Sequence, residues 1–368
     1  MRGRDVALAT LLREDVAEPC INYSWMTSSS YLSRAAGRDY WSDPEGVFYD
    51  YLRHCGINLV PQWYFPGEAQ RNIERGVVAH EPLPHGLQQT TCPEDVVRQI
   101  EALPDEAQVE RDYDVESACE AYARPLLERM ARAEHEVLFI DGFGQADFMG
   151  GYTRWGYEHY LMALVDYPEA MQRYYHHSAL VGRLLNEAIV LACRRHNLAP
   201  FVYSGQDICA AGGPIASPAV LRRVYFPELK WCMEPLVANG IGVIWHCDGN
   251  INPILPDLLD LGIAGLQGFE EEHGVDYEEI VRLRDRAGRP LIVLGCVSVV
   301  STLPHGTVAD VRRAVERSFT AAGRGRGFVL SSTSSVMPEV PHANIDALFE
   351  HGRRFGREFL GGPARREG

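Results

Sequence analysis

The run WHCDGN, at residues 245–250, places a histidine, a cysteine and an aspartate side by side behind the apolar residues GVI. Side chains alternate between the two faces of a strand, so His246 and Asp248 project together while Cys247 points away. An imidazole and a carboxylate on one face suit three roles: metal ligands, a metal-free acid–base or orienting pair, or structural hydrogen bonding. We expect His246 and Asp248 to be the main functional pair of the chain.

Polar side chains also follow other apolar runs. Asp207 stands in SGQDICAAGG beside Gln206, and Asp141 stands in FIDGFG. We assign Asp207 to the catalytic set and Asp141 and Gln206 to substrate binding, with helix capping as the alternative for each carboxylate. Tyr203 and Trp245 are either walls of a substrate pocket or core residues.

Two further residues are candidate metal ligands. Glu270 follows an apolar run in GFEEEHG, and Cys296 ends the run PLIVLGC. Zinc accepts histidine, cysteine and carboxylate ligands in tetrahedral sets, so either side chain suits a site with the main pair. A buried, small apolar residue is the alternative for Cys296. The predicted ligand set for zinc or another divalent metal is His246, Asp248, Glu270 and Cys296.

The elements that must position these residues alternate along the chain. Short apolar runs are followed by turns and by longer amphipathic segments, which is typical of α/β folds. The eight runs start near Cys20, Ile57, Glu136, Pro200, Gly242, Ala264, Pro290 and Gly327. Eight such units predict a (β/α)8 TIM barrel, in which functional residues gather at the carboxyl ends of the strands.

Helix signals support this alternation. Ser217 and Pro218 predict a helix start, and Gly240 predicts its end. DYEEIVRLRDRAG and TVADVRRAVERSFTAAG show the same scheme, with acidic residues early, arginine late and a final glycine. We expect a single barrel domain over 1–368, with a polar insertion at about 66–114 that covers the barrel mouth.

Composition excludes several classes of protein. A net charge of -15 argues against a nucleic-acid partner, which needs a basic surface. Nine cysteines at irregular spacing indicate a reducing compartment rather than a disulfide framework. No apolar run is long enough to span a membrane, and the first residues do not form a signal peptide. We therefore expect a cytoplasmic protein with a small-molecule substrate.

Four blocks in the second half of the chain carry a family resemblance. They are SGQD with GGPIASP, then WHCDGNINPILPDLLDLGIAGL, then GCVSVVSTLPHGTVADVRRAVE, and SSTSSVMPEVPHANIDALFEHGRRFG. In this order they resemble the uroporphyrinogen decarboxylase superfamily, and within it the cobalamin-dependent methyltransferases that serve coenzyme M. The resemblance implies a (β/α)8 barrel, methyl transfer to a small polar molecule, zinc, a corrinoid methyl donor, a corrinoid protein as partner, and a homodimer.

The ligand positions depart from the pattern of that branch, which has His-x-Cys after the fifth strand and a further Cys after the eighth. Asp248 stands at the first Cys position and Ser334 at the later one. The resemblance therefore places His246 and Asp248 in a rebuilt metal site that lacks both thiolates. Arg34 and Arg38 resemble the arginine loop of the decarboxylase, which makes Arg38 a candidate substrate ligand.

Three functions remain open on these residues. The first is a methyltransferase with a rebuilt metal site. The second is a decarboxylase or other lyase that acts on a small carboxylic acid, because aspartate ligands suit harder cations and acid–base chemistry better than thiol activation. The third is a barrel that binds a small molecule or a corrinoid protein without catalysis.

Overall fold

The computed structural model describes residues 1–75 and 85–362, which form two compact units. The first unit consists of Met1–Ala79, Leu126–Asp141 and Ala264–Gly368, and the second of His80–Pro125 and Gly142–Ile263. Each unit is built from parallel strand pairs and helices. The expected single domain over 1–368 stays a prediction.

The first unit contains six of the predicted apolar runs. Its strands are β1 (Leu59–Val60), β2 (Leu138–Phe139), β7 (Gly265–Gln267), β8 (Ile292–Val297) and β9 (Phe328–Ser332). Parallel pairing joins β1 to β2, β7 to β8, and β8 to β9. The run at Cys20 lies between β9 and β1, because Ile21 forms a parallel bridge with Leu330 and Asn22 with Leu59. All six residues of β8 are buried, as in a strand covered on both faces.

The second unit contains the other two runs. Strand β3 (Phe201–Gly205) pairs in parallel with β6 (Gly242–His246), and a short antiparallel hairpin joins β4 (Cys209–Ala210) to β5 (Gly213–Pro214). All eight predicted runs are therefore in parallel pairing, and helices follow each of them along the chain.

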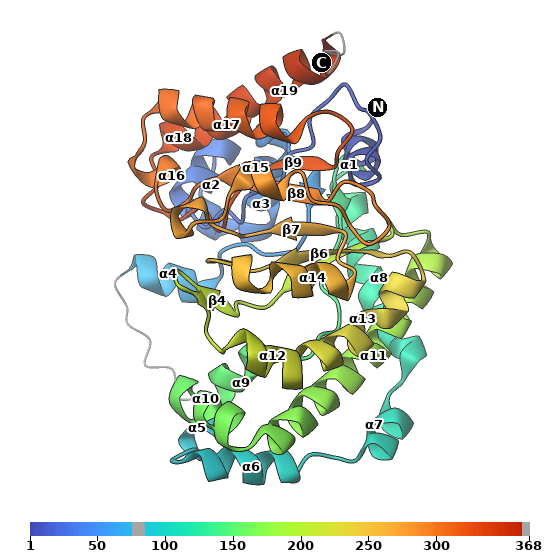
Figure 1. Ribbon diagram of the computed structural model, residues 1–368. Helices are drawn as coiled ribbons and strands as arrows, with labels where there is room; N and C mark the ends of the chain where they lie inside the picture. Colours follow the sequence, from blue (N-terminus) through green and yellow to red (C-terminus); the bar gives the residue numbers. More distant parts are fainter. Residues whose placement is uncertain (76–84, 363–368) are drawn as a thin grey trace. The chain divides into compact units, whose positions relative to one another are not determined.

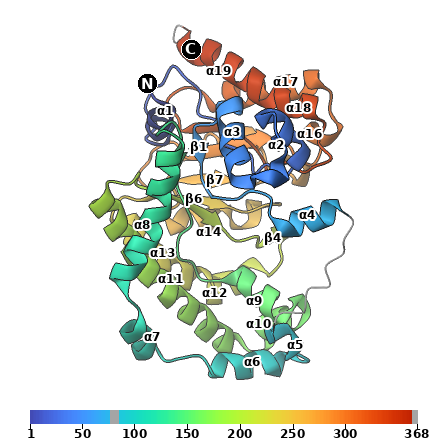
Figure 2. The same cartoon turned by 180° about the vertical axis from the view of Figure 1, so that it is seen from behind.

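The first unit also contains helices. They are α1 (Gly3–Leu11), α2 (Ser29–Ala36), α3 (Pro44–Cys55), α4 (Glu68–Glu74), α15 (Tyr277–Ile280), α16 (Thr302–His305), α17 (Val308–Ala322), α18 (His342–Asp346) and α19 (Gly352–Gly361). Helix α17 packs against β8 and β9 (Figure 1), and α2 lies beside α3, as the opposite view shows (Figure 2). Helix α17 thus covers the apolar side chains of two neighbouring strands.

Long helices dominate the second unit. They are α5 (His85–Gln88), α6 (Pro93–Glu101), α7 (Glu106–Asp112), α9 (Phe148–Trp155), α10 (Tyr157–Asp166), α11 (Pro168–His196), α12 (Pro218–Val224), α13 (Phe226–Ala238) and α14 (Leu255–Leu261). Helix α8 (Val115–Arg132) contains the boundary between the units at Pro125. Helices α11 and α13 run side by side (Figure 1), and their contact forms the main helix–helix packing of this unit.

The predicted insertion at about 66–114 is helical where it is described. It contains α4, α5, α6 and α7. Residues 76–84 lie outside the described residues, so the part of the prediction that falls on them has no structural account. That the insertion covers the barrel mouth stays a prediction.

The helix signals predicted two helix starts correctly, but one predicted helix is divided in two and another is shorter than expected. Ser217 caps α12, accepting a hydrogen bond from the backbone N–H of Val220 at 3.3 Å, and Thr307 caps α17. The helix expected from Ser217 to Gly240 is divided at Tyr225, because Pro227 lacks the N–H that would continue the ladder.

The helix expected over 276–288 was wrong in length, since α15 ends at Ile280. The Asp285 carboxylate accepts hydrogen bonds from the backbone N–H groups of Ala287 and Arg289, both at 3.0 Å. It also forms an ion pair with the buried guanidinium of Arg13 at 3.1 Å. These contacts stabilise a turn around Asp285, which competes with a continued helix.

No helix within residues 1–75 and 85–362 combines the length and the apolar character that a membrane span requires.

Candidate functional site

The ends of β3 and β6 position the main pair in the second unit. Their register places Gly205 opposite His246. A Cβ atom at Gly205 would lie 1.7 Å from the backbone oxygen of His246, so only glycine permits this approach. Asp207 lies two residues after Gly205, and Asp248 lies two residues after His246. Paired strand ends therefore bring two aspartates and one histidine to the same edge.

The three side chains form one cluster. Nε2 of His246 lies 3.3 Å from Oδ1 of Asp207 and 3.8 Å from Oδ1 of Asp248. One ligand atom from each residue lies within 4.8 Å of the other two. The side chains of His246, Asp207 and Asp248 are 22%, 40% and 34% exposed, so solvent and small solutes reach the cluster.

Backbone contacts fix the aspartates. The N–H of Asp248 donates to Oδ1 of Asp207 at 3.4 Å. Gly249 has φ +81°, and a Cβ there would lie 2.7 Å from the backbone oxygen of Ala210. The N–H of Asn250 donates to that same oxygen at 3.0 Å. The turn after β6 is thus held against the β4 hairpin, and glycine is required where the two backbones meet.

The charges of the cluster are strongly coupled. Burial opposes the imidazolium form of His246, but the hydrogen bond to Asp207 and the charges of both aspartates outweigh it and raise the pKa of His246 to about 9. Burial acts to raise the pKa of Asp207, but the hydrogen bond and the charge of His246 outweigh it, so the net pKa is lowered. The two carboxylates are therefore stabilised by a positive charge between them. Either a proton on His246 or a bound cation supplies this charge.

The donor set fits a divalent metal. It offers one imidazole nitrogen and two carboxylate oxygens on neighbouring strand ends. Zinc accepts such ligands, and harder cations such as Mn²⁺ favour the carboxylates. No sulfur belongs to this set. Cys247 is buried, and its Sγ donates to the backbone oxygen of Asp248 at 3.3 Å.

Glu270 and Cys296 belong to the first unit, and the cluster around His246 does not contain them. Glu270 is buried and its carboxylate lies 2.8 Å from Nδ1 of His273. Cys296 is also buried, its Sγ lies 3.8 Å from Oε2 of Glu271, and burial raises the pKa of the thiol. Their roles as metal ligands stay predictions.

Two predicted substrate ligands of the first unit form ion pairs. The carboxylate of Asp141 accepts from Nη1 of Arg129 at 2.8 Å. Arg38 binds Asp43 and Asp50, each at 2.9 Å. These contacts fasten neighbouring segments of the chain. That Asp141 and Arg38 bind substrate stays a prediction.

The remaining predicted substrate ligands lie near the cluster or in the core. The ring of Tyr203 is buried and lies 6.2 Å from that of His246, measured between centroids, and its contact with substrate stays a prediction. Gln206 is buried, and its side-chain oxygen accepts the first two backbone N–H groups of α9 at 2.9 and 2.7 Å. Trp245 is fully buried and packs against Phe143. Gln206 thus caps a helix, and its contact with substrate stays a prediction.

Sequence reasoning missed the positioning residues Gly205 and Gly249, and it did not count Asp207 among the ligands. The available signal was the repeated offset: an aspartate stands two residues beyond Gly205 and two beyond His246. The phenol of Tyr152 was also missed. It donates to the backbone oxygen of Asp207 at 3.5 Å.

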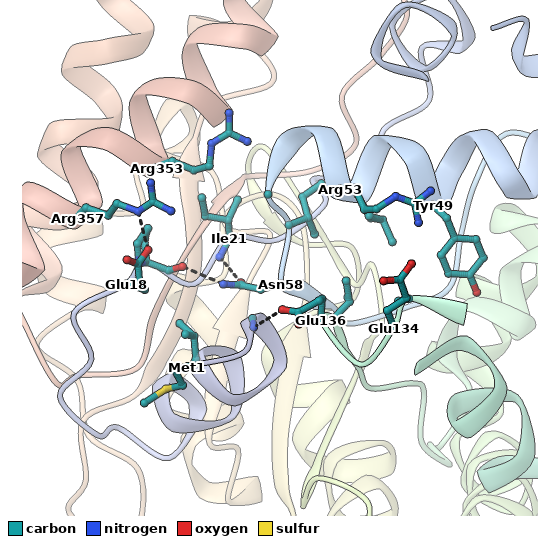
Figure 3. A pocket seen from close by; sticks show the side chains of 18 residues that line it. Met1, Glu18, Ile21, Tyr49, Arg53, Asn58, Glu134, Glu136, Arg353 and Arg357 are labelled. Carbon is teal, nitrogen blue, oxygen red and sulfur yellow. Dashed lines mark hydrogen bonds and ion pairs between the residues drawn. The ribbon is translucent and has the colours of Figure 1, made fainter. Parts of the chain in front are cut away.

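A cavity of about 470 Å³ lies elsewhere, in the first unit (Figure 3). It adjoins the amino ends of β1 and β2, because Asn58 and Val137 line it and directly precede these strands. Polar side chains that line it bind other groups of the protein. Arg357 donates to Glu18 at 2.6 Å, and Glu136 accepts a hydrogen bond from the backbone N–H of Gly3 at 2.9 Å. In barrels this end of the strands serves stability, and none of the predicted site residues lines the cavity.

Comparisons with known proteins identify the family and the fold. Residues 145–355 match the model of the family described as uroporphyrinogen decarboxylase (URO-D). A methylcobamide:CoM methyltransferase MtaA of Methanosarcina barkeri strain Fusaro is 28% identical over 149 residues, which are 40% of this chain and 41% of the relative. A second MtaA of Methanosarcina barkeri is 30% identical over 150 residues, with the same shares. The match thus spans about two fifths of these relatives.

The fold has a solved counterpart. The structure of a methyltransferase from Methanosarcina mazei matches with a TM-score of 0.59 at 17% identity, over 96% of this chain and 99% of that one. Together with the match to the family model, this confirms the predicted α/β fold, a (β/α)8 TIM barrel of the uroporphyrinogen decarboxylase type.

Proposed function

The chain belongs to the uroporphyrinogen decarboxylase family, and we propose that within it the protein is a methyltransferase-like enzyme that acts on a small polar molecule. The family resemblance predicted from the four sequence blocks is confirmed by the family model and the MtaA relatives. Those relatives are named for a methylcobamide donor and the acceptor CoM, which supports a corrinoid, delivered by a corrinoid protein, as the methyl donor of this enzyme.

The observation that carries the proposal is the cluster of Asp207, His246 and Asp248. It stands at the carboxyl ends of two paired strands, where barrel enzymes keep their catalytic groups. His246 and Asp248 occupy the His-x-Cys positions of the methyltransferase branch, and Asp207 adds a carboxylate from the neighbouring strand. We assign these three residues as the metal ligands of the enzyme, with Glu270 and Cys296 as secondary candidates.

Each residue of the cluster has its own role in the proposed enzyme. Nε2 of His246 and one oxygen from each aspartate would hold a zinc ion or another divalent cation. When bound, the cation would supply Lewis acidity that lowers the pKa of a thiol or water beside it. Tyr203, whose ring centroid lies 6.2 Å from that of His246, is assigned to substrate binding beside the cluster. In the metal-free protein, His246 instead holds a proton at Nε2 between the two carboxylates.

A second candidate function is a decarboxylase or other lyase on a small carboxylic acid. The absence of sulfur from the cluster favours it, because oxygen-rich sites suit harder cations and proton transfer rather than thiolate activation. In this version His246 would not be a metal ligand: protonated at Nε2, it would donate its proton to the carbanion that forms as carbon dioxide leaves the substrate. The same three side chains serve both candidates, but His246 binds the metal only in the first.

The test is a paired assay of the full chain loaded with Zn²⁺ or Mn²⁺. Demethylation of methylcobalamin is followed by its visible spectrum with a panel of small thiols and other polar acceptors, and carbon dioxide release is followed with small carboxylic acids. Asp248→Asn is the test variant. Asp257→Asn is the matched control, because Asp257 pairs with Arg222 and belongs to neither three-residue metal-ligand group of the described residues.

Methyl transfer that is lost in Asp248→Asn and kept in Asp257→Asn supports the methyltransferase. Carbon dioxide release that is lost in Asp248→Asn and kept in Asp257→Asn rejects the methyltransferase and supports the lyase. Turnover in neither assay, with a small acid or cobalamin still bound, leaves a binding barrel and rejects both enzymatic proposals.

A further inference from the structure

A second group of metal-ligand side chains lies in the second unit, on helices that do not carry the site described above. Cys119 and Glu120 stand on α8, and His196 is the last residue of α11. Their ligand atoms all lie within 4.8 Å of one another, and Nε2 of His196 lies 3.1 Å from Oε1 of Glu120. The two helices thus bring a thiol, a carboxylate and an imidazole to one point.

The packing of the helices explains why the thiol is held there. Cys119 is fully buried in a small apolar cluster with Ala123 of α8 and with Ala188 and Ala192 of α11. Alanine side chains allow the two helices to approach closely. Glu120 and His196 keep 53% and 23% of their side chains exposed. A metal ion can therefore enter from solvent and meet the buried sulfur beneath.

Charge at this point also favours a divalent cation. Nη1 of Arg195 lies 2.7 Å from Oε2 of Glu116 and 3.2 Å from Oε1 of Glu120. With Cys119 as thiolate, the two glutamates and the sulfur carry three negative charges against one on Arg195, which leaves a net charge of minus two. The carboxyl end of α11 adds a partial negative charge. A cation of charge plus two balances the group.

We propose that Cys119, Glu120 and His196 form a zinc site that fastens α8 to the end of α11. Zinc takes sulfur, nitrogen and oxygen ligands in tetrahedral sets, which matches one cysteine, one histidine and one glutamate. The thiol of Cys193, one turn before His196, faces the backbone oxygen of Ala199 at 3.9 Å. A water molecule therefore supplies the fourth ligand.

The sulfur ligand gives this site a signature that the Asp207–His246–Asp248 cluster does not have. Co²⁺ replaces Zn²⁺ in such sites, and a thiolate ligand adds a near-ultraviolet charge-transfer band to the visible bands of tetrahedral cobalt. The full chain is stripped with a chelator, kept reduced with a phosphine, and titrated with Co²⁺. We expect a charge-transfer band that grows with added Co²⁺, saturates, and disappears when Zn²⁺ is added.

The variants assign the band to this site. Cys119→Ala and His196→Ala should abolish it, and Glu120→Gln should weaken Co²⁺ binding at this site by at least about tenfold. Glu116→Gln is the matched control for Glu120→Gln, because both residues bind Arg195 but only Glu120 belongs to the group. Cys193→Ala and His246→Ala should keep the band.

Alanine suits the position of Cys119, which already lies among alanines, so Cys119→Ala is expected to fold. The proposal is overturned if the wild type shows no charge-transfer band at saturating Co²⁺, or if the band survives Cys119→Ala. Neither of these outcomes depends on methyl transfer or on the cluster around His246.

Discussion

Nε2 of His246 lies 3.3 Å from Oδ1 of Asp207, and this contact joins the carboxyl ends of two neighbouring parallel strands. Gly205 makes the contact available, because it is the residue of β3 that faces His246. The histidine and the two aspartates form a site only while this strand register is kept.

Gly205→Ala should therefore damage both the fold and the site. The new Cβ would lie 1.7 Å from the backbone oxygen of His246, so the two strand ends must separate. We expect a loss of about 3 kcal/mol or more in the free energy of unfolding and a large loss of metal affinity. Urea denaturation and metal titration measure the two effects.

Gly212→Ala is the matched control for this change. It lies in the same unit, and a Cβ there meets nothing within 4 Å. Its free energy of unfolding should stay within about 0.5 kcal/mol of wild type. Equal stability of the two variants would show that the close approach at Gly205 is not needed.

The stability of the metal-free protein should fall at alkaline pH. The pKa of His246 is raised from 6.5 to about 9 by its aspartate partners, despite its burial. The protonated form of His246 therefore stabilises the folded state. This contribution to the free energy of unfolding is fully present below about pH 6.5 and is lost as the pH rises through 9. The difference is worth about 3 kcal/mol at most.

Urea denaturation in chelator at a series of pH values measures this loss, and His246→Gln should flatten the profile between pH 6.5 and 9. His177→Gln is the control, because burial and the charges of Arg173 and His176 lower the pKa of His177. A wild-type profile that matches that of His246→Gln would refute the charge coupling.

Metal binding should compete with the proton on His246. The imidazole binds a metal only when it is neutral, so apparent affinity at this cluster should rise about tenfold per pH unit between pH 6.5 and 9. Cys119→Ala removes the second predicted metal group and isolates this effect. Calorimetry in buffers of different ionisation enthalpy should detect release of about one proton per metal ion. An affinity that does not change with pH would argue against His246 as a ligand.

Asp248→Cys should change the metal preference of the cluster. A thiolate is a softer ligand than a carboxylate, so the preference for Zn²⁺ over Mn²⁺ should rise by at least about tenfold. In a Cys119→Ala background, Co²⁺ should then show a thiolate charge-transfer band that this background alone lacks. Competition titrations with Zn²⁺ and Mn²⁺ measure the preference, and an unchanged ratio would remove Asp248 from the ligand set.

Much of the fold could be predicted from the sequence because strands and helix starts have local signals. The eight apolar runs all pair in parallel, and Ser217 and Thr307 cap helices as expected. The helix at 276–288 was overestimated because the decisive partner of Asp285 is Arg13, which is distant in sequence. Local helix propensity does not predict a contact between residues so far apart in the sequence.

The site could be predicted only in part for the same reason. Alternation along β6 placed His246 and Asp248 on one face, but Asp207 joins them through the register between two strands. Gln206 lies next to Asp207 in sequence, and its side chain caps α9. Partner choices of this kind depend on tertiary packing, which a single sequence does not reveal.

The central claim is that Asp207, His246 and Asp248 bind one metal ion. Crystals of the Cys119→Ala protein grown with Mn²⁺ or Zn²⁺, and measured at the absorption edge of that metal, test it most directly. We predict an anomalous peak within coordination distance, about 2.0–2.2 Å, of Nε2 of His246 and of one oxygen from each aspartate. Full occupancy of the metal elsewhere, with no peak between these three side chains, would contradict the claim.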